Sequence, residues 1–202
     1  MTGHGPEHFD TVIEVASELV SKRKVELTPY EVFILLASIQ VHDIGNILGR
    51  IDHEKNARDV FYEAIPQQEF LDSVENEIFF NVAQAHSGNI NGDKDTIGNV
   101  ERYTPYNGKK LRTKLIASII RLADELADAP NRAYTFLKKL GLIVKGSEIY
   151  HIYASSLKST NIELDKDEIN LSYKFEVNDA NKKYGKGNAK KYLLDEIFER
   201  NL

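Results

Sequence analysis

The chain has 202 residues, no cysteine and a formal net charge of −5 at pH 7. With 42% hydrophobic residues the chain can bury one main core. The lack of thiols excludes disulfide scaffolds and thiolate metal sites, and the negative charge argues against a binder of nucleic-acid polymers. No apolar run suggests a membrane span of about 20 residues, and residues 1–6 lack a signal-peptide core. We therefore expect a cytoplasmic protein without membrane contact.

The first predicted helix carries a histidine on its apolar face. His8 lies four residues before Val12, which places both side chains on the same stripe of a helix. A buried imidazole needs a partner, so His8 is a candidate for a polar centre inside the core. The apolar residues that define the stripe are Val12, Val15, Ala16 and Leu19.

The second predicted helix ends in the adjacent pair His42-Asp43. Thr28 can cap its start, and Glu31 can complete a capping box three residues later. The run of residues 32–41 is too apolar for a surface helix. The pair is therefore expected to emerge from the core at a helix end.

Two further histidines are expected close to this pair. His53 lies in the first turn of a predicted helix over residues 53–65, for which Asp52 is a candidate cap. His86 closes a fourth helix, just before a glycine stop. It lies on the face formed by Phe79, Val82 and Ala83.

A late aspartate lies on the apolar stripe of a fifth helix. Residues 88–108 are rich in Gly, Asn and Asp and predict a long loop, and helical periodicity follows from Leu111 to Ala127. Asp124 lies four residues after Ile120 and should face the core. Buried charges are costly unless paired, so these groups are expected to meet around a metal ion or in a hydrogen-bonded network.

The hydrophobic period changes to two near Gly141. Residues 162–164 and the alternating residues 169–177 predict a hairpin, with a further strand around 148–154 and a final helix over 188–200. We expect a mainly α fold. It comprises a helical bundle over residues 1–140 and a small α+β extension over residues 141–202, with a hairpin or three-stranded sheet and a terminal helix.

Four motifs resemble, in order, those of the HD-superfamily metal-dependent phosphohydrolases: His4–Val12, His42–Gly45, Ala85–Gly88 and Arg121–Leu126. The resemblance covers roughly residues 1–135 and implies an HD-type helical bundle. It implies that one metal ion is held by His8, His42, Asp43 and Asp124. It further suggests His53 and His86 as ligands of a second ion, with Asp43 as the bridging carboxylate.

The resemblance implies hydrolysis of a phosphate ester or anhydride, in a nucleotide or another phosphorylated small molecule, with Asp43, His53 and His86 in catalytic roles. Nitrogen and oxygen ligands suit Mn, Fe, Mg, Co, Ni or Zn. One or two ions remain open, because His53 could be a solvent-exposed residue at a helix start and His86 could interact with a helix dipole. A homo-oligomer is compatible with the sequence.

The chain departs from the pattern at two places. Asn46 stands where some branches have a lysine three residues after the pair, and residues 87–92 lack the Gly-Tyr-Pro motif of the cyclic-dinucleotide phosphodiesterase (HD-GYP) branch. A sensory or scaffolding HD module that binds metal and nucleotide without turnover is the alternative. The candidates for contact with a substrate phosphate are His4, Lys109, Arg112, Arg121 and Arg132.

Overall fold

A computed structural model describes residues 6–49, 53–64, 73–87, 93, 95–127, 141, 143, 147–163, 166–185, 187 and 190–201. The chain divides into two compact units, of which Phe9–Ala127 form one and residues 1–8 with Asp128–Leu202 form the other. The molecule is mainly helical with small antiparallel sheets, which confirms the predicted fold class.

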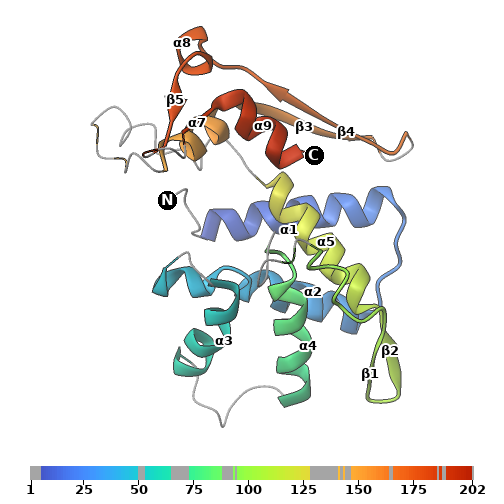
Figure 1. Cartoon of the computed structure of the whole chain (residues 1–202). Coiled ribbons are helices and arrows are strands. Elements are labelled where there is room, and N and C mark those ends of the chain that lie inside the picture. Colours follow the sequence, from blue (N-terminus) through green and yellow to red (C-terminus); the bar gives the residue numbers. More distant parts are fainter. Residues whose placement is uncertain are drawn as a thin grey trace. The chain divides into compact units, whose positions relative to one another are not determined.

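The larger unit is a helical bundle (Figure 1). Its α2 packs on α4 and α5, while α3 packs on the 3₁₀ helix η1 and on α4. Buried apolar residues from α1, α2, α4 and α5 form the core, including Val12, Ile34, Ile39, Phe79 and Ile120. The elements are α1 (Pro6–Lys22), α2 (Pro29–Val41), η1 (Ile44–Leu48), α3 (His53–Ala64), α4 (Ser73–Gln84), β1 (Thr104–Tyr106), β2 (Lys109–Leu111) and α5 (Thr113–Leu126). The first turn of α1, with His8, is continuous with the part of α1 that belongs to this bundle.

The start of α2 has the predicted capping box. The backbone nitrogen of Glu31 donates to Thr28 Oγ1 at 3.2 Å, and Thr28 N donates to Glu31 Oε2 at 2.9 Å. The helix is less deeply buried than its composition suggested, because Val32, Phe33 and Leu36 are 37–40% exposed. One side of α2 faces the core and the other reaches the surface.

Glu31 also fastens α2 to α5. Its side chain is buried, and the Arg112 guanidinium donates to it through Nε at 2.8 Å and Nη2 at 2.6 Å. The hydrogen bond from Arg112 is the largest influence and holds the pKa of Glu31 down to about 2, against the opposing effect of burial. The paired charges thus fix the N-terminal ends of two helices that supply site residues at their C-terminal ends.

Among the described residues, one segment, Pro29–Leu48, is long and apolar enough to cross a membrane by length and composition alone, although the sequence analysis expected no apolar run of that length. Half of this apolar stretch is buried inside the protein. The regular α-helix also stops at Val41, and the 3₁₀ helix η1 follows. These features are those of a core helix in a bundle.

Part of the predicted long loop is a β-hairpin. Strands β1 and β2 pair antiparallel, with Tyr106 opposite Lys109. The two residues between them, Asn107 and Gly108, both have positive φ, of 47° and 71°. This is the backbone that a two-residue hairpin turn requires, and Asn-Gly is the dipeptide that favours it most. The dipeptide could have revealed the hairpin from the sequence.

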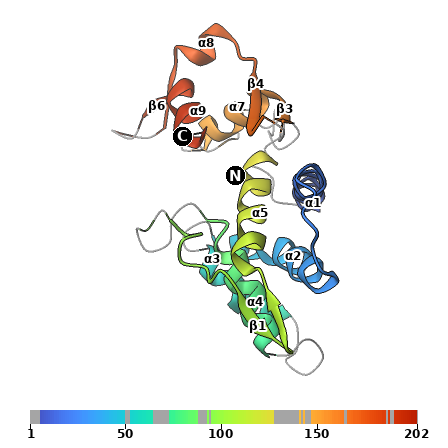
Figure 2. The ribbon, with the colours of Figure 1, turned by 90° about the vertical axis from the view of Figure 1, so that its right-hand side faces the viewer.

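The smaller unit contains α7 (Glu148–Ser156), β3 (Leu157–Glu163), β4 (Glu168–Tyr173), α8 (Val177–Ala180), β5 (Lys183–Tyr184), β6 (Lys191–Tyr192) and α9 (Leu193–Asn201). The predicted β3–β4 hairpin is confirmed, with Ile162 opposite Ile169. Helices α7 and α9 pack together (Figure 2). Their shared core includes Ile149, Ile152, Tyr153, Tyr184 and Leu193.

Two predictions for this unit are wrong in detail. The strand expected at residues 148–154 is helix α7, because Ile149, Ile152 and Tyr153 follow helical spacing although Ile and Tyr favour strands individually. The terminal helix begins at Leu193 rather than near residue 188, since the short strand β6 precedes it. Residues 188–189 lie outside the described part of the chain.

Candidate metal centre

The His42-Asp43 pair lies where α2 ends and η1 begins. Gly45, two residues later, is buried, and a Cβ at this position would overlap the carbonyl oxygen of His53 and lie 2.7 Å from the nitrogen of Ala57. The missing side chain therefore lets the start of α3 come against η1. This close approach brings His53 toward Asp43.

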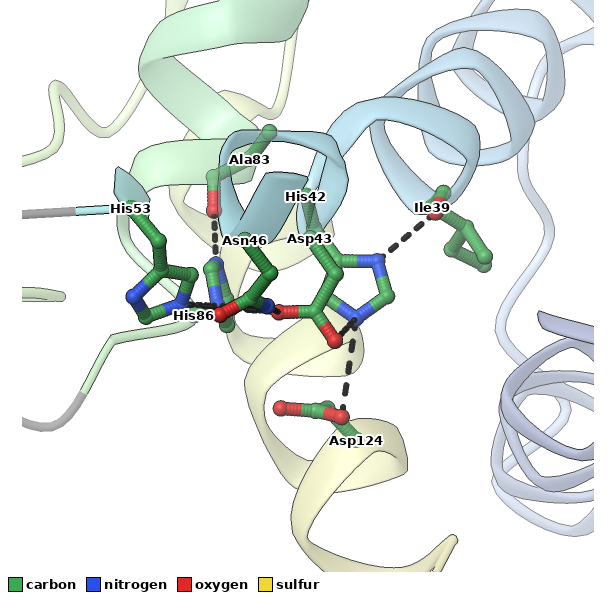
Figure 3. Close-up of polar contacts among 8 residues, drawn as sticks. All are labelled: Ile39, His42, Asp43, Asn46, His53, Ala83, His86 and Asp124. Atoms are coloured by element: carbon green, nitrogen blue, oxygen red, sulfur yellow. Dashed lines mark hydrogen bonds and ion pairs between the residues drawn. The ribbon is translucent and has the colours of Figure 1, made fainter. Parts of the chain in front are cut away.

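His42 is oriented by its own helix. Its Nδ1 lies 2.7 Å from the carbonyl oxygen of Ile39, and a carbonyl can only accept, so Nδ1 carries the proton. Nε2 then points to Asp43 Oδ2 at 3.4 Å and to Asp124 Oδ1 at 3.6 Å (Figure 3). With Nδ1 committed to this hydrogen bond, the ring would present the Nε2 lone pair to a metal once Nε2 has lost its proton.

His86 is oriented in the same way from a different element. It lies two residues beyond the end of α4, in a turn, and its Nδ1 donates to the carbonyl oxygen of Ala83 at 2.6 Å. Its Nε2 lies 3.3 Å from His53 Nε2 and 3.7 Å from Asp43 Oδ1. His53 Nε2 lies 3.4 Å from the same carboxylate oxygen. Three donor atoms thus converge on one point (Figure 3).

The cluster has two halves that share Asp43. The ligand atoms of His8, His42 and Asp43 lie within 4.8 Å of one another, and so do those of Asp43, His53 and His86. We call the first group, together with Asp124, the His42 half, and the second group the His86 half. Each half offers imidazole nitrogens and carboxylate oxygen, a donor set that suits divalent transition metals and magnesium.

The two halves differ in charge. Burial lowers the pKa of His42, but the carboxylates of Asp124 and Asp43 outweigh it and raise this pKa to about 10. Burial, followed by the nearby positive charge of His42, lowers the pKa of His86 to about 4. In the metal-free protein at neutral pH, one imidazolium therefore lies between two carboxylates. A bound divalent ion would have to displace its proton.

Two basic residues predicted to contact substrate lie far from this cluster. Arg112 stands twelve residues before Asp124, which corresponds to about 18 Å along α5, and its guanidinium is bound to Glu31. Lys109 lies in β2, before Arg112. Neither is included in the candidate site. His4 and Arg132 lie outside the described residues.

Arg121 does lie beside the cluster, but it contacts the protein itself. Its Nη1 is 3.1 Å from the Ser87 carbonyl oxygen and 2.5 Å from Thr96 Oγ1. Thr96 was not predicted from the sequence. Nothing in a loop nine residues beyond Ser87 distinguishes this threonine from an exposed one.

Asn46 gains a specific role in the structure. Its side-chain Nδ2 donates to Asp43 Oδ1 at 2.8 Å (Figure 3). The sequence alone identifies this residue only as a departure from the lysine of some HD branches. The two residues are three apart where the chain enters η1, so their spacing alone permits the contact.

A separate cavity of about 360 Å³ lies along α4 and the segment of residues 96–104. None of the six candidate metal ligands lines it. Its walls mix apolar residues with neutral polar ones and one acid, Glu101, and the lining includes no lysine or arginine. We do not assign this cavity to a phosphorylated substrate of the His/Asp cluster.

A helical bundle that gathers a His-Asp pair, further histidines and a late aspartate into one cluster is an HD-type domain. The family model HD-CE matches residues 1–200, and the chain belongs to this family. The match spans both compact units. Searches of curated proteins and of solved structures found no match to the chain.

Proposed function

We propose that this protein is a metal-dependent phosphohydrolase that cleaves a phosphate ester or anhydride in a small molecule such as a nucleotide. The observation that carries the proposal is the position of Asp43 between two sets of imidazoles. Asp43 Oδ2 faces His42, while Oδ1 faces His53 and His86. One carboxylate that serves two adjacent ligand groups is what a site for two ions needs.

The six candidate ligands can be assigned to two ions, and their exposure indicates the side from which substrate would approach. His8, His42 and Asp124 would hold one ion with Asp43, and His53 and His86 would hold a second. Such ions supply an activated water and neutralise the charge of the phosphate oxygens. His42, Asp43 and His86 have side chains that are at most 6% exposed, whereas those of His53 and Asp124 are 16% and 23% exposed. Substrate would approach from the side of the two more exposed ligands.

Orientation of the ligands is the contribution of the surrounding chain. The carbonyl oxygens of Ile39 and Ala83 fix the tautomers of His42 and His86, and Asn46 holds Oδ1 of Asp43. Partners of this kind orient metal ligands and raise metal affinity. The cluster is thus organised before an ion arrives.

The proposal can be tested with purified protein loaded with manganese. Release of phosphate or nitrophenol would be measured with a panel of nucleotides and an aryl phosphodiester. We expect turnover in the wild type and none above background in Asp43→Ala. Asp59→Ala, which removes an exposed aspartate from α3 by the same Asp-to-Ala change, is the matched control and should remain active. Equal rates for wild type and Asp43→Ala would contradict the proposal.

A non-catalytic sensor is the second candidate, and Asn46 favours it. This neutral amide contacts Asp43 at the position where related branches carry a lysine, so no cation is delivered to a substrate there. A sensor would bind nucleotide in the metal-loaded protein without hydrolysing it. Calorimetric nucleotide binding alongside zero turnover would favour this alternative.

A further inference from the structure

The carbonyl groups on either side of His86 share one buried side chain. Helix α4 ends at Gln84, and the carbonyls beyond a helix end lack intrahelical partners. Thr96 Oγ1 lies 3.0 Å from the oxygen of Ala85 and 2.8 Å from the oxygen of Ser87. The turn that carries His86 into the cluster is thus held from both sides by a residue of a later segment.

Arg121 completes this arrangement. A threonine hydroxyl has one hydrogen to donate, whereas the Nη1 of arginine has two. Arg121 Nη1 can give one hydrogen to Ser87 O, at 3.1 Å, and the other to Thr96 Oγ1, at 2.5 Å. The Thr96 hydroxyl is then available for the oxygen of Ala85. With this assignment every group in the set has a partner.

The geometry points to Thr96 and Arg121 as positioning residues for His86. The hydrogen bond from Nδ1 to Ala83 sets the tautomer of the ring, and Thr96 with Arg121 sets the place of the backbone that carries it. We call this pair the Thr96 brace. The inference rests on the proposed function in one respect, namely that His86 is a metal ligand.

Burial and position make the brace specific. Thr96 is 2% exposed, so water cannot easily replace its hydroxyl. Arg121 lies three residues before Asp124, on the same side of α5. One helix thereby supplies a ligand to the His42 half and a support to the His86 half. This role differs from the predicted contact of Arg121 with a substrate phosphate.

The first test compares Thr96→Val with Thr96→Ser in the full chain. Valine keeps the shape and removes the hydroxyl, whereas serine keeps the hydroxyl. Cobalt would be titrated into the metal-free proteins, followed by calorimetry and visible absorption. In Thr96→Val we expect the dissociation constant of the ion in the His86 half to rise about 10-fold, as for other partners of metal ligands, and that of the ion in the His42 half to stay unchanged. Thr96→Ser should stay within about 2-fold of the wild type, because the hydroxyl and both of its hydrogen bonds, to Ala85 and from Arg121, are retained.

Two results of this titration would overturn the brace. One is wild-type affinity for both ions in Thr96→Val. The other is equal weakening of both ions, which would indicate a general loss of structure. Arg121→Gln is the second variant if Thr96→Val does not fold, and the same pattern is expected of it.

A second readout does not depend on metal. Nitrogen-15 spectra of the histidine rings in the metal-free protein report which ring nitrogen carries hydrogen. We expect a single Nδ1–H form of His86 in the wild type and in Thr96→Ser, and a mixture of tautomers in Thr96→Val and Arg121→Gln. If the wild type binds only one ion, the two-ion hydrolase fails, yet this spectrum still decides the brace. An unchanged His86 signal in both variants would overturn it.

Discussion

In both halves of the His/Asp cluster a histidine ring is held by a backbone carbonyl, but the pKa of that histidine is raised in one half and lowered in the other. His42 and His86 each donate Nδ1 to the carbonyl oxygen three residues earlier, which belongs to Ile39 in one case and Ala83 in the other. Each ring therefore presents Nε2 to the cluster. The hydrogen bond to the carbonyl three residues earlier therefore sets the orientation of each ring, although the two histidines come from different elements.

Charge distinguishes the halves. The His42 half contains two carboxylates, Asp43 and Asp124, whereas the His86 half shares one carboxylate between two imidazoles. Since anionic oxygens attract a divalent cation more strongly than neutral nitrogens do, the His42 half should bind the tighter ion. In the proposed two-ion site the His42 half would therefore fill first and the His86 half second. The variants below test that order.

Asp43→Ala should have the largest effect because Asp43 belongs to both halves. We expect loss of both ions at stoichiometric metal and a fall in turnover on the order of 10³-fold. Metal content by mass spectrometry after desalting is the measurement. Retention of either ion in full would show that the halves do not depend on the shared carboxylate.

Replacing one histidine at a time separates the halves. His86→Ala should leave one ion bound, with turnover reduced roughly 10- to 100-fold, because only the weaker half is damaged. His42→Ala should lower the affinity of the tighter ion instead. Calorimetric stoichiometry distinguishes the two variants. If His86→Ala still binds two ions, the second-site assignment is wrong.

The stability of the metal-free protein should depend on pH in opposite directions for the two histidines. The pKa of His86 is about 4 in the folded protein and about 6.5 in the unfolded chain. The contribution of this residue to the free energy of unfolding is therefore fully present above about pH 6.5 and is lost as the pH falls toward 4. The raised pKa of His42, of about 10, means that its stability is present below about pH 6.5 and is lost as the pH rises toward 10.

Urea unfolding across this pH range measures both effects, each on the order of a few kcal/mol. His86→Gln should remove the loss on the acid side and keep the loss on the alkaline side. Saturating metal should reduce the loss on the alkaline side, since an ion would take the place of the His42 proton. It should not relieve the loss on the acid side, because protons compete with the metal for the imidazoles as the pH falls. A stability profile that is flat from pH 4 to 10 in the metal-free protein would contradict these assignments.

Asn46→Ala should have the smallest effect. It removes one hydrogen bond to Asp43 Oδ1, the oxygen that faces the His86 half, and leaves Oδ2 and the His42 half unaltered. We expect the affinity of the weaker ion to fall about 5- to 10-fold, in line with a net hydrogen bond of about 1 kcal/mol. Cobalt titration beside Asn46→Gln, which keeps an amide, makes the comparison. Equal weakening of both ions would count against it.

Helical periodicity was sufficient to predict the helices of the bundle and the burial of two of the site histidines. It placed His8 on the buried stripe of α1 and His42 at the end of α2, and both are at most 2% exposed. It could do so because the apolar face of a helix is set by spacing within one segment. The cap of α2 was predictable for the same reason, since its partners are three residues apart.

Contacts between distant segments that lie outside the recognised motifs could not be predicted. The Thr96 brace joins α5 to a turn after α4, and no local pattern encodes it. The strand expected at residues 148–154 failed for a related reason. Individual preferences of Ile and Tyr for strands were outweighed by packing of α7 against α9. Strand preference is a statement about surroundings, which the sequence alone does not supply.

The bare backbone at Gly45 has a consequence for how this site can vary. Its lack of a methyl group sets how near α3 comes to η1, and hence whether His53 can reach Asp43. Gly45→Ala would replace no candidate ligand and alter no charge, yet its added methyl group would clash with the backbone of α3 and push the two segments apart. If the proposed two-ion site is correct, occupancy of the His86 half would therefore depend on a residue that contacts no ion.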